Sequence, residues 1–390
     1  MKDLSQISVL VFGASGRQAL PVCKGLRQIG CRVITYCRSK WDTGYLTKYK
    51  TESILYNTET ADGLNFNEYG LKLIHENRYA LVIPLGDETA IFLSKHKEEL
   101  GSKTKVAVND WDIQQYAADK AKTMKVCEEH CIPAPRTVFG EHIIEQIEQT
   151  DFTYPVVVKP RTGVGSIGFS IVKSKEKLID YLNAYNGANG PLLVQEYIKQ
   201  GELPQYRADL FRTRDGTFKA AMVCKVTRWY PLDGGSGIFV VSVRDDEILD
   251  NCKRLLDAIG WVGYANIDMV YDEDAKKAKI LEINGRTGAS IKIDYVSGVN
   301  ISQLIVENEL GYPVTDMTDY KVGEKITCLL PDLLWFLKSP DRFRTDPSWF
   351  QRWGVKDVIF SWSDPLPSIG FLIESVSGYR SAMNKRKRID

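Results

Sequence analysis

The chain has 390 residues, 51 lysines and arginines against 50 aspartates and glutamates, and 44% hydrophobic residues. This length predicts a globular protein of two or three domains. The balanced charge excludes the strongly basic character of a nucleic-acid-binding protein, and the hydrophobic fraction excludes extensive disorder. A small molecule is therefore the expected partner.

The cysteines and the apolar segments indicate where the protein works. The eight cysteines form no C-x-x-C pair, and the first residues (MKDLSQ) lack the apolar stretch of a secretory signal, so we expect reduced thiols and a cytoplasmic protein. Pro331 and Asp332 interrupt LLPDLLWFL, and no segment approaches the roughly 20 apolar residues of a membrane-spanning helix. The basic tail NKRKRID (384–390) fits either a solvated chain end or a peripheral contact with an anionic membrane.

The first hundred residues alternate short apolar strands with helical patterns. Strands are expected at SVLVFGASG, CRVITYC and ALVIPLGDE, and helices at 20–29, at 71–76 and before Leu100. This alternation predicts a doubly wound α/β domain over residues 1–110, with helices on both faces of a parallel sheet. Gly13 and Gly16 lie at the first strand-to-helix turn. Their spacing falls short of the dinucleotide motif G-x-G-x-x-G, so tight-turn glycines are the alternative to a dinucleotide site.

Residues 111–320 have the pattern of an α+β region with mostly antiparallel strands. A helix over 117–130 ends before the prolines of CIPAP, because proline cannot continue a helix. The further expected elements are strands at 154–159 and FSIV, a helix at 175–185, the strand LLVQEYI, strands at 206–212, 217–225 and 238–243, a helix at 246–259 and a hairpin over 262–283. Residues 321–390 are expected to form a C-terminal extension rich in aromatic residues.

The expected hairpin, YANIDMVYDEDAKKAKILEIN, brings two carboxylates together. A symmetric hairpin centred on Ala275 places Asp268 opposite Glu282, and Asn284 follows on the same face. Two carboxylates at that distance repel by about 3 kcal/mol at an effective dielectric near 20. Such oxygen ligands suit a hard cation such as Mg²⁺, with nucleotide phosphates supplying further oxygens. The alternative is a polar strand face that Arg286 or a lysine neutralises.

A glycine-rich loop follows the strand that ends near Lys159. In YPVVVKPRTGVGSIG (154–168), the glycines would let backbone N–H groups approach phosphate oxygens, and the lysine adds a positive charge. The loop is not a Walker A motif, because G-K-[ST] is absent. We expect phosphate binding here, with a flexible loop between two strands as the alternative.

Three motifs in this order resemble those of ATP-grasp enzymes. They are Lys120 in ADKAK, Lys159 in VVVKPRTGVGSIG, and the hairpin NIDMV…LEINGR, and the resemblance covers residues 110–300. The N-terminal unit, with LVIPLGDETA, is similar to the preceding domain of the carboxylate–amine ligase branch, which also contains biotin carboxylase and carbamoyl phosphate synthetase. WSDPLP (362–367) is similar to a segment of predicted carboligases akin to D-aspartate ligase. The resemblance implies ATP-grasp domains over 111–320, with a lid subdomain at about 121–195.

The resemblance also implies how ATP would bind. The two lysines would contact its phosphates, the glycine loop would close over them, and the backbone around Tyr197 would bind adenine. Where the family often has an acidic ribose ligand, this chain has Gln205, so Glu202 is the candidate for that contact. The implied ATP-binding residues are Lys120, Lys159, Thr162, Gly163, Gly165, Ser166, Gly168, Glu196, Tyr197, Ile198 and Glu202.

Metal and catalytic residues follow from the same resemblance. Asp268 and Glu282 would hold two Mg²⁺ ions, or Mn²⁺, with Glu282 bridging them and Asn284 completing the second site. Arg286 would lie beside the transferred phosphoryl group. The family's frequent N-P-R is N-G-R here, which is expected to loosen the backbone before Arg286. Lys225 and Arg228, in CKVTRWYPLDGGSG, are expected to end a strand beside the cleft and to contact a substrate, with solvent-exposed charges as the alternative.

The expected function is that of a Mg-ATP-dependent ligase. It would activate a carboxylic acid as an acyl phosphate and join it to an amine, with an amino acid on at least one side. Bicarbonate activation through carboxyphosphate, as in carbamoyl phosphate synthesis, is the second hypothesis, and a nucleotide-binding module without turnover is the third. The resemblance further suggests a homodimer.

Overall fold

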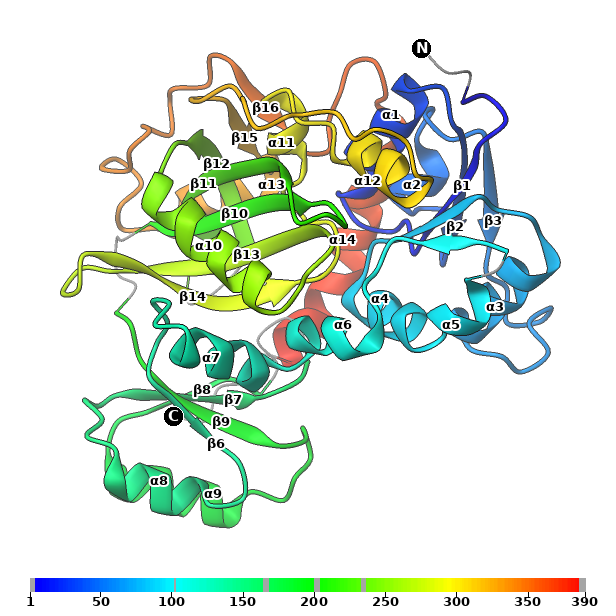
Figure 1. Cartoon of the computed structure of the whole chain (residues 1–390). Helices are drawn as coiled ribbons and strands as arrows, with labels where there is room; N and C mark the ends of the chain where they lie inside the picture. Colours follow the sequence, from blue (N-terminus) through cyan, green and yellow to red (C-terminus); the bar gives the residue numbers. More distant parts are fainter. Residues whose placement is uncertain (1–3, 102, 164–167, 200–203, 233–235, 386–390) are drawn as a thin grey trace.

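The structure, a computed structural model, describes residues 4–101, 103–163, 168–199, 204–232 and 236–385, of which 376–385 are described by their backbone alone. Within these ranges the chain forms sheets of five, seven and four strands. The five-stranded and seven-stranded sheets lie side by side, and the four-stranded sheet projects from beneath the large one (Figure 1). The predicted fold class, a doubly wound α/β unit followed by mostly antiparallel sheets, is confirmed.

The N-terminal sheet is entirely parallel, in the order β3-β2-β1-β4-β5. Alternate residues of β1 point to opposite faces of this sheet. Val9 and Val11 pack in a core with the first helix, whereas Leu10 and Phe12 pack in a second core on the other face. The elements are β1 (Ser8–Phe12), α1 (Ala19–Gln28), β2 (Arg32–Cys37), α2 (Thr43–Leu46), β3 (Glu52–Leu55), α3 (Phe66–Glu76), β4 (Leu81–Pro84), α4 (Asp87–Lys95), α5 (Lys97–Leu100) and β5 (Lys105–Val106).

The four-stranded sheet has one covered face and one that faces the large sheet. Val156 and Val158 pack into a core with the helices α8 and α9, whereas Val157 and Lys159 line a cavity on the other side. The strand order is β6-β9-β7-β8, all antiparallel. The elements are α6 (Trp111–Ala118), α7 (Lys120–Glu129), β6 (Thr137–Phe139), α8 (Ile143–Gln149), β7 (Val156–Pro160), β8 (Ser170–Val172), α9 (Lys175–Ala184) and β9 (Leu192–Glu196).

The seven-stranded sheet, in the order β14-β13-β10-β11-β12-β15-β16, separates two cores. One contains the apolar face of α10, and the other is shared with α1 and β1, so the large sheet and the N-terminal sheet pack as neighbours. Its elements are β10 (Gln205–Arg212), β11 (Phe218–Tyr230), β12 (Ser236–Val243), α10 (Asp246–Ala258), β13 (Gly263–Asp272), β14 (Lys277–Asn284), α11 (Lys292–Val296), α12 (Ile301–Glu309), β15 (Lys325–Thr327), α13 (Leu329–Lys338) and β16 (Val355–Asp357).

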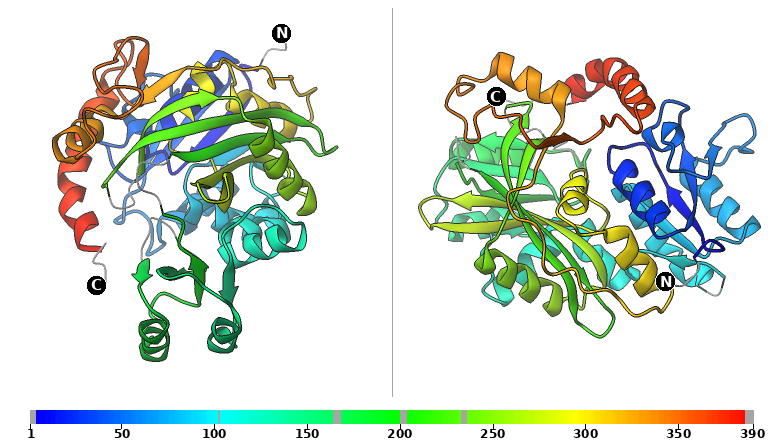
Figure 2. Two further views of the ribbon diagram at one scale, coloured as in Figure 1. Left: turned by 90° about the vertical axis from the view of Figure 1, so that its left-hand side faces the viewer. Right: turned by 90° about the horizontal axis from the view of Figure 1, so that it is seen from above.

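The C-terminal residues join the two large sheets. The helix α14 (Leu366–Lys385) lies next to α13 along one edge of the molecule and packs against α2 (Figure 2). Asp364, in the WSDPLP segment, is buried and accepts hydrogen bonds from Thr47 Oγ1 at 2.5 Å and from the Lys48 backbone N–H at 3.1 Å. The carboxylate of this segment therefore anchors the C-terminal extension to the N-terminal unit. In the part of the chain that the structure describes, no helix combines the length and hydrophobicity of a membrane span.

Candidate active site

A cavity of about 810 Å³ opens between the three sheets. Its lining comes from β7 and β9 of the small sheet, from β10, β13 and β14 of the large sheet, and from N-terminal residues that include Arg17 and Asp87. Small-molecule sites typically occupy roughly 300–1,000 Å³. The cavity is therefore large enough for a nucleotide together with a small second molecule.

Two lysines reach this cavity from different elements. Lys120 begins α7, and its Nζ lies 2.9 Å from the Gly163 carbonyl oxygen and 3.2 Å from Glu282 Oε2. Asp119, which caps the same helix, accepts hydrogen bonds from Arg161 Nε at 3.1 Å and from Arg161 Nη2 at 2.6 Å. This bidentate pair fixes the start of α7 against the segment that follows Lys159.

Lys159 has an unusual ionisation. Its pKa is lowered to about 8, mainly by burial; Glu282 partly opposes this shift, and Lys120 contributes to it. Among the described residues, no carboxylate lies within ion-pair distance of the Lys159 ammonium group. Lys120, Arg207 and Arg286 each have such a partner. An anion that enters the cavity would therefore interact with a positive charge that is already largely removed from water.

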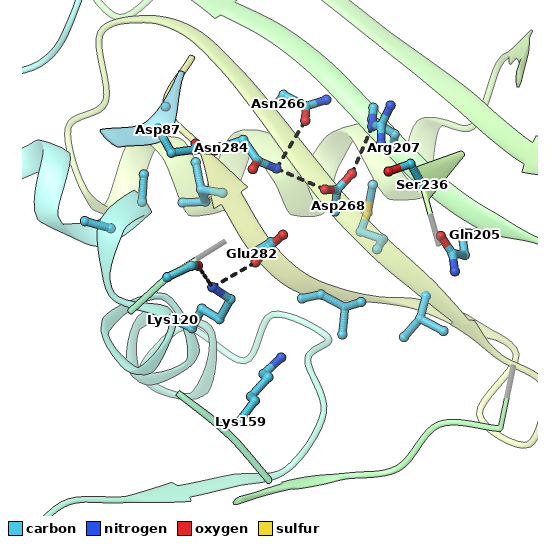
Figure 3. Close-up of a pocket in the computed structure, with 18 of the residues that line it drawn as sticks. Asp87, Lys120, Lys159, Gln205, Arg207, Ser236, Asn266, Asp268, Glu282 and Asn284 are labelled. Carbon is cyan, nitrogen blue, oxygen red and sulfur yellow. Dashed lines mark hydrogen bonds and ion pairs between the residues drawn. The ribbon is translucent and has the colours of Figure 1, made fainter. Parts of the chain in front are cut away.

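The β13–β14 hairpin has the predicted register at Asp268 and Glu282, whereas an irregularity after Asp268 shifts the pairs nearer the turn by one residue. Asp268 pairs with Glu282, and Asn266 pairs with Asn284. Each carboxylate has its own cation: Arg207 Nε donates to Asp268 Oδ1 at 2.9 Å, and Lys120 lies beside Glu282 (Figure 3). The alternative interpretation expected Arg286 or a lysine to neutralise this strand face. Lys120 does so for Glu282, whereas Asp268 is neutralised by Arg207 of the neighbouring strand.

The donor set fits a divalent cation that is shared with a nucleotide. Among the described residues, no group of three or more His, Cys, Asp and Glu side chains converges as a complete protein-only metal site. Asp268, Glu282 and Asn284 instead supply oxygens only, and the two carboxylates are 29% and 32% exposed to the cavity. Mg²⁺ commonly binds through one or two carboxylates, with phosphates and water completing its shell.

Arg286 is held at the edge of the same site. Its Nη2 donates to Asp87 Oδ2 at 3.0 Å and to Asn284 Oδ1 at 3.1 Å. Gly285 is closely surrounded, because a Cβ atom there would lie 2.3 Å from Gln114 Nε2 and 2.8 Å from the Trp261 ring. Glycine therefore permits a close approach of Gln114 and Trp261 at this point.

The segment Glu196 to Ile198 also lines the cavity. The Glu196 backbone N–H donates to the Arg136 carbonyl at 2.8 Å, so an adenine contact by Glu196 would use its carbonyl oxygen. Its side chain accepts from Lys279 Nζ at 3.0 Å and from the Arg136 backbone N–H at 3.1 Å. The carboxylate of Glu196 is therefore structural and fixes the backbone of this segment.

Comparison with known proteins gives the family. The ATP-grasp domain family model matches residues 117–290, which contain both lysines and the hairpin. The chain belongs to the ATP-grasp superfamily. This ATP-grasp protein is 26% identical to a D-aspartate ligase from Enterococcus faecium over 284 residues, which are 66% of this chain and 67% of that protein.

Two further proteins show the extent of the similarity. The carbamoyl phosphate synthase large chain of Thermotoga petrophila is 22% identical over 355 residues, which are 86% of this ATP-grasp protein but only 31% of that chain. The biotin carboxylase domain of Hydrogenobacter thermophilus 2-oxoglutarate carboxylase, solved as a dimer with MgADP and bicarbonate, has a TM-score of 0.67 at 16% identity. That alignment covers 82% of this chain and 73% of that one, and at this identity it shows the fold alone.

The structure brings most of the predicted site residues of this ATP-grasp protein together. Gly168 does not line the cavity, and Gly165, Ser166 and Glu202 lie outside the described residues. The predicted site residues that do line the cavity are Lys120, Lys159, Thr162, Gly163, Glu196, Tyr197, Ile198, Asp268, Glu282, Asn284 and Arg286.

Lys225 and Arg228 need a correction. They do not end a strand, because β11 continues to Tyr230, and neither lines the cavity. Arg228 is fully buried, its Nε lies 2.8 Å from Asp332 Oδ1, and its guanidinium stacks over the Phe239 ring at 3.8 Å. Neither the expected substrate contact nor the solvent-exposed alternative describes Arg228. It forms a buried ion pair beneath the large sheet.

Sequence reasoning missed several polar residues of the site. Four of them line the cavity. Arg207 and Asn266 belong to strands of the large sheet, whereas Arg17 and Asp87 come from the N-terminal unit. The signal for Arg207 would have been the pairing of β10 with β13, which sets it opposite Asp268. That pairing joins segments about 60 residues apart and has no local sequence signature.

Proposed function

We propose that this ATP-grasp protein is a Mg-ATP-dependent ligase that activates a carboxylic acid as an acyl phosphate and joins it to an amine. One observation carries the proposal: two lysines and an arginine converge with two carboxylates and an amide oxygen on a single cavity. Phosphoryl transfer needs mainly alignment and neutralisation of charge on the moving oxygens, and this set supplies both.

Each residue has a role that follows from its position. Lys120 and Lys159 would bind the β- and γ-phosphates of ATP, and Asp268, Glu282 and Asn284 would hold Mg²⁺. The bound metal would neutralise charge on the phosphate oxygens. Arg286 would stabilise the γ-phosphoryl group as its bond to ADP breaks and a new bond forms to the substrate carboxylate. The amine would then attack the carbonyl carbon, and phosphate would leave as the amine loses a proton.

Arg17 points to the charge of the second substrate. Its Nη2 donates to the Gly237 carbonyl oxygen at 3.2 Å, and it contacts the Cys328 side chain. Lys120, Arg207 and Arg286 each have a carboxylate partner, whereas the described residues give Arg17 none. We infer that Arg17 attracts an anionic group of the acid or of the amine, as a carboxylate of an amino acid would provide.

A second function has its own support. The similarity to a carbamoyl phosphate synthase large chain extends over 86% of this protein, which favours bicarbonate as the activated acid. The chain spans only about a third of that relative, so the remaining steps of carbamoyl phosphate synthesis would need further polypeptides. A nucleotide-binding module without turnover is the third candidate.

Release of ADP separates the three functions. We expect ADP to form from Mg-ATP only when a pool of organic acids, including amino acids, and a pool of amines are both present. Release with bicarbonate alone would instead support carboxyphosphate chemistry. Folded protein that binds Mg-ATP but releases no ADP with any pool would contradict both enzymatic functions and favour the binding module.

The lowered pKa of Lys159 predicts how ATP binding depends on pH. Because its pKa in the folded protein is lowered to about 8, its charge is lost as the pH rises through that value. We expect the dissociation constant of Mg-ATP to rise by up to about tenfold between pH 7 and pH 9, measured by calorimetry. Lys159→Arg keeps the charge over this range and should remove most of the dependence. An identical pH profile in both proteins would exclude Lys159 as its source.

The same shift has an opposite effect on stability. The pKa of Lys159 is about 8 in the folded protein and has its ordinary value of 10.5 in the unfolded chain. Keeping this lysine charged therefore costs folding free energy below pH 8, and the cost disappears as the pH rises from 8 to 10.5. ATP binding and folding stability should thus respond to alkaline pH in opposite directions.

A further inference from the structure

A buried carboxylate behind the hairpin determines how the neighbouring amide is oriented. Asp209, on β10, is 1% exposed. Its Oδ1 accepts hydrogen bonds from the Tyr264 hydroxyl and, at 2.7 Å, from Asn266 Nδ2. An ionised carboxylate can only accept hydrogen bonds, so Asn266 must turn its NH₂ group toward Asp209. Its carbonyl oxygen then faces the other way, toward β14.

The next amide in the sequence of contacts is that of Asn284. Asn266 Oδ1 accepts from Asn284 Nδ2 at 3.2 Å, and the same nitrogen donates to Asp268 Oδ2 at 3.0 Å. Both hydrogens of the Asn284 NH₂ group are therefore used within the protein. The Asn284 oxygen faces Arg286, whose Nη2 donates to it at 3.1 Å.

A flip of the side-chain amide of either Asn266 or Asn284 would require the other amide to flip as well. If Asn266 were flipped, its oxygen would face the Asp209 oxygen, and two acceptors would meet in a buried place. Its NH₂ group would then face the NH₂ group of Asn284, which would have to flip as well. Asn284 would then present its NH₂ group where its oxygen now accepts from Arg286, and an NH₂ group cannot bind a cation.

We propose that Asp209 is a positioning residue for the metal site, which it serves by fixing the Asn284 amide with its oxygen toward the cation. The inference rests on the proposed function, in which Asn284 is a metal ligand. Residues behind a metal ligand commonly orient it in this way, and their loss typically weakens metal binding by about 10- to 100-fold.

Asp294 supports the charge that this role requires. It is completely buried and contacts Asp209. Burial and the negative charge of Asp209 raise the pKa of Asp294 well above its ordinary value, so Asp294 is a neutral acid that can donate its proton in a hydrogen bond. Burial also raises the pKa of Asp209, and Arg207 and the donors Tyr264 and Asn266 oppose that shift. Because Asp209 Oδ1 accepts from both Tyr264 and Asn266, this oxygen is the acceptor that the arrangement of the amides needs.

Binding of Mn²⁺ tests the proposal without turnover. The affinity for Mn²⁺ is measured by electron paramagnetic resonance in the presence of a non-hydrolysable ATP analogue. We expect Asp209→Asn, which can donate as well as accept, to weaken Mn²⁺ binding by about 10- to 100-fold. Asn284→Ala should weaken it at least as much. In the Asn284→Ala background, Asp209→Asn should then have no further effect, because its influence passes through Asn284.

Two controls keep the test decisive. Tyr264→Phe removes the other hydrogen bond to Asp209 but leaves the amides in place, so it should lower the thermal midpoint without weakening Mn²⁺ binding. If Asp209→Asn does not fold, Asn266→Ala breaks the next contact and should give the same loss and the same lack of additivity. Effects of Asp209→Asn and Asn284→Ala that add, an equal loss of affinity in Tyr264→Phe, or unchanged binding in Asp209→Asn would overturn the proposal. Wild-type protein that binds no Mn²⁺ with the analogue would instead refute the proposed function.

Discussion

Replacing Glu282 with glutamine is expected to reduce ADP formation at least about a hundredfold, while the thermal midpoint stays close to that of the wild type. The substitution keeps the size of the side chain but removes a negative charge that would bind Mg²⁺. It also leaves Lys120, 3.2 Å away, without its carboxylate. Both side chains are partly exposed to the cavity, so the lost ion pair contributes little to folding. The measurements are the steady-state rate of ADP release and the unfolding midpoint.

A matched substitution in the same hairpin separates chemistry from folding. Glu273 is an exposed residue of the β13–β14 turn and does not line the cavity. Glu273→Gln makes the same chemical change and is expected to leave ADP release and the thermal midpoint unchanged. Equal activity in the Glu282 and Glu273 variants would remove Glu282 from the metal site.

The elements that could be predicted are those whose signal is local. The β13–β14 register followed from the positions of apolar residues and a single turn, so Asp268 and Glu282 were correctly placed opposite each other. By contrast, β15 and β16 are three-residue strands that exist because they extend the large sheet beside β12. Segments so short carry no periodic pattern, and distant pairing decides their structure.

The missed and misplaced site residues have the same cause. Cys224, Val226 and Arg228 are alternate buried residues of β11, and α13 packs against this strand. The sequence shows the alternation, but not that a helix about 100 residues later supplies Asp332 to pair with the arginine. Lys120 and Lys159 were found because each lies in a motif, whereas Arg207 and Asp209 depend on which strand lies next to β13.

Asp332→Asn is expected to lower the free energy of unfolding by about 3–5 kcal/mol, because it leaves the Arg228 charge buried without a carboxylate. Both side chains of this pair are 0% exposed. Asp332 also accepts hydrogen bonds from Arg352 Nη1 at 2.7 Å and from Thr327 Oγ1 at 3.0 Å, so the substitution weakens several contacts of one carboxylate. Denaturant-induced unfolding measures the change.

Asp319→Asn is the matched control for this loss. Asp319 is fully exposed, and its oxygen lies 3.9 Å from Arg244, so solvent screens the pair and no measurable change in stability is expected. Because Arg228 lies outside the cavity, Asp332→Asn should also leave the Mg-ATP affinity of the folded protein unchanged. Equal stability of the two variants would show that the buried pair does not hold α13 to the sheet, and a selective loss of Mg-ATP affinity would return Arg228 to the active site.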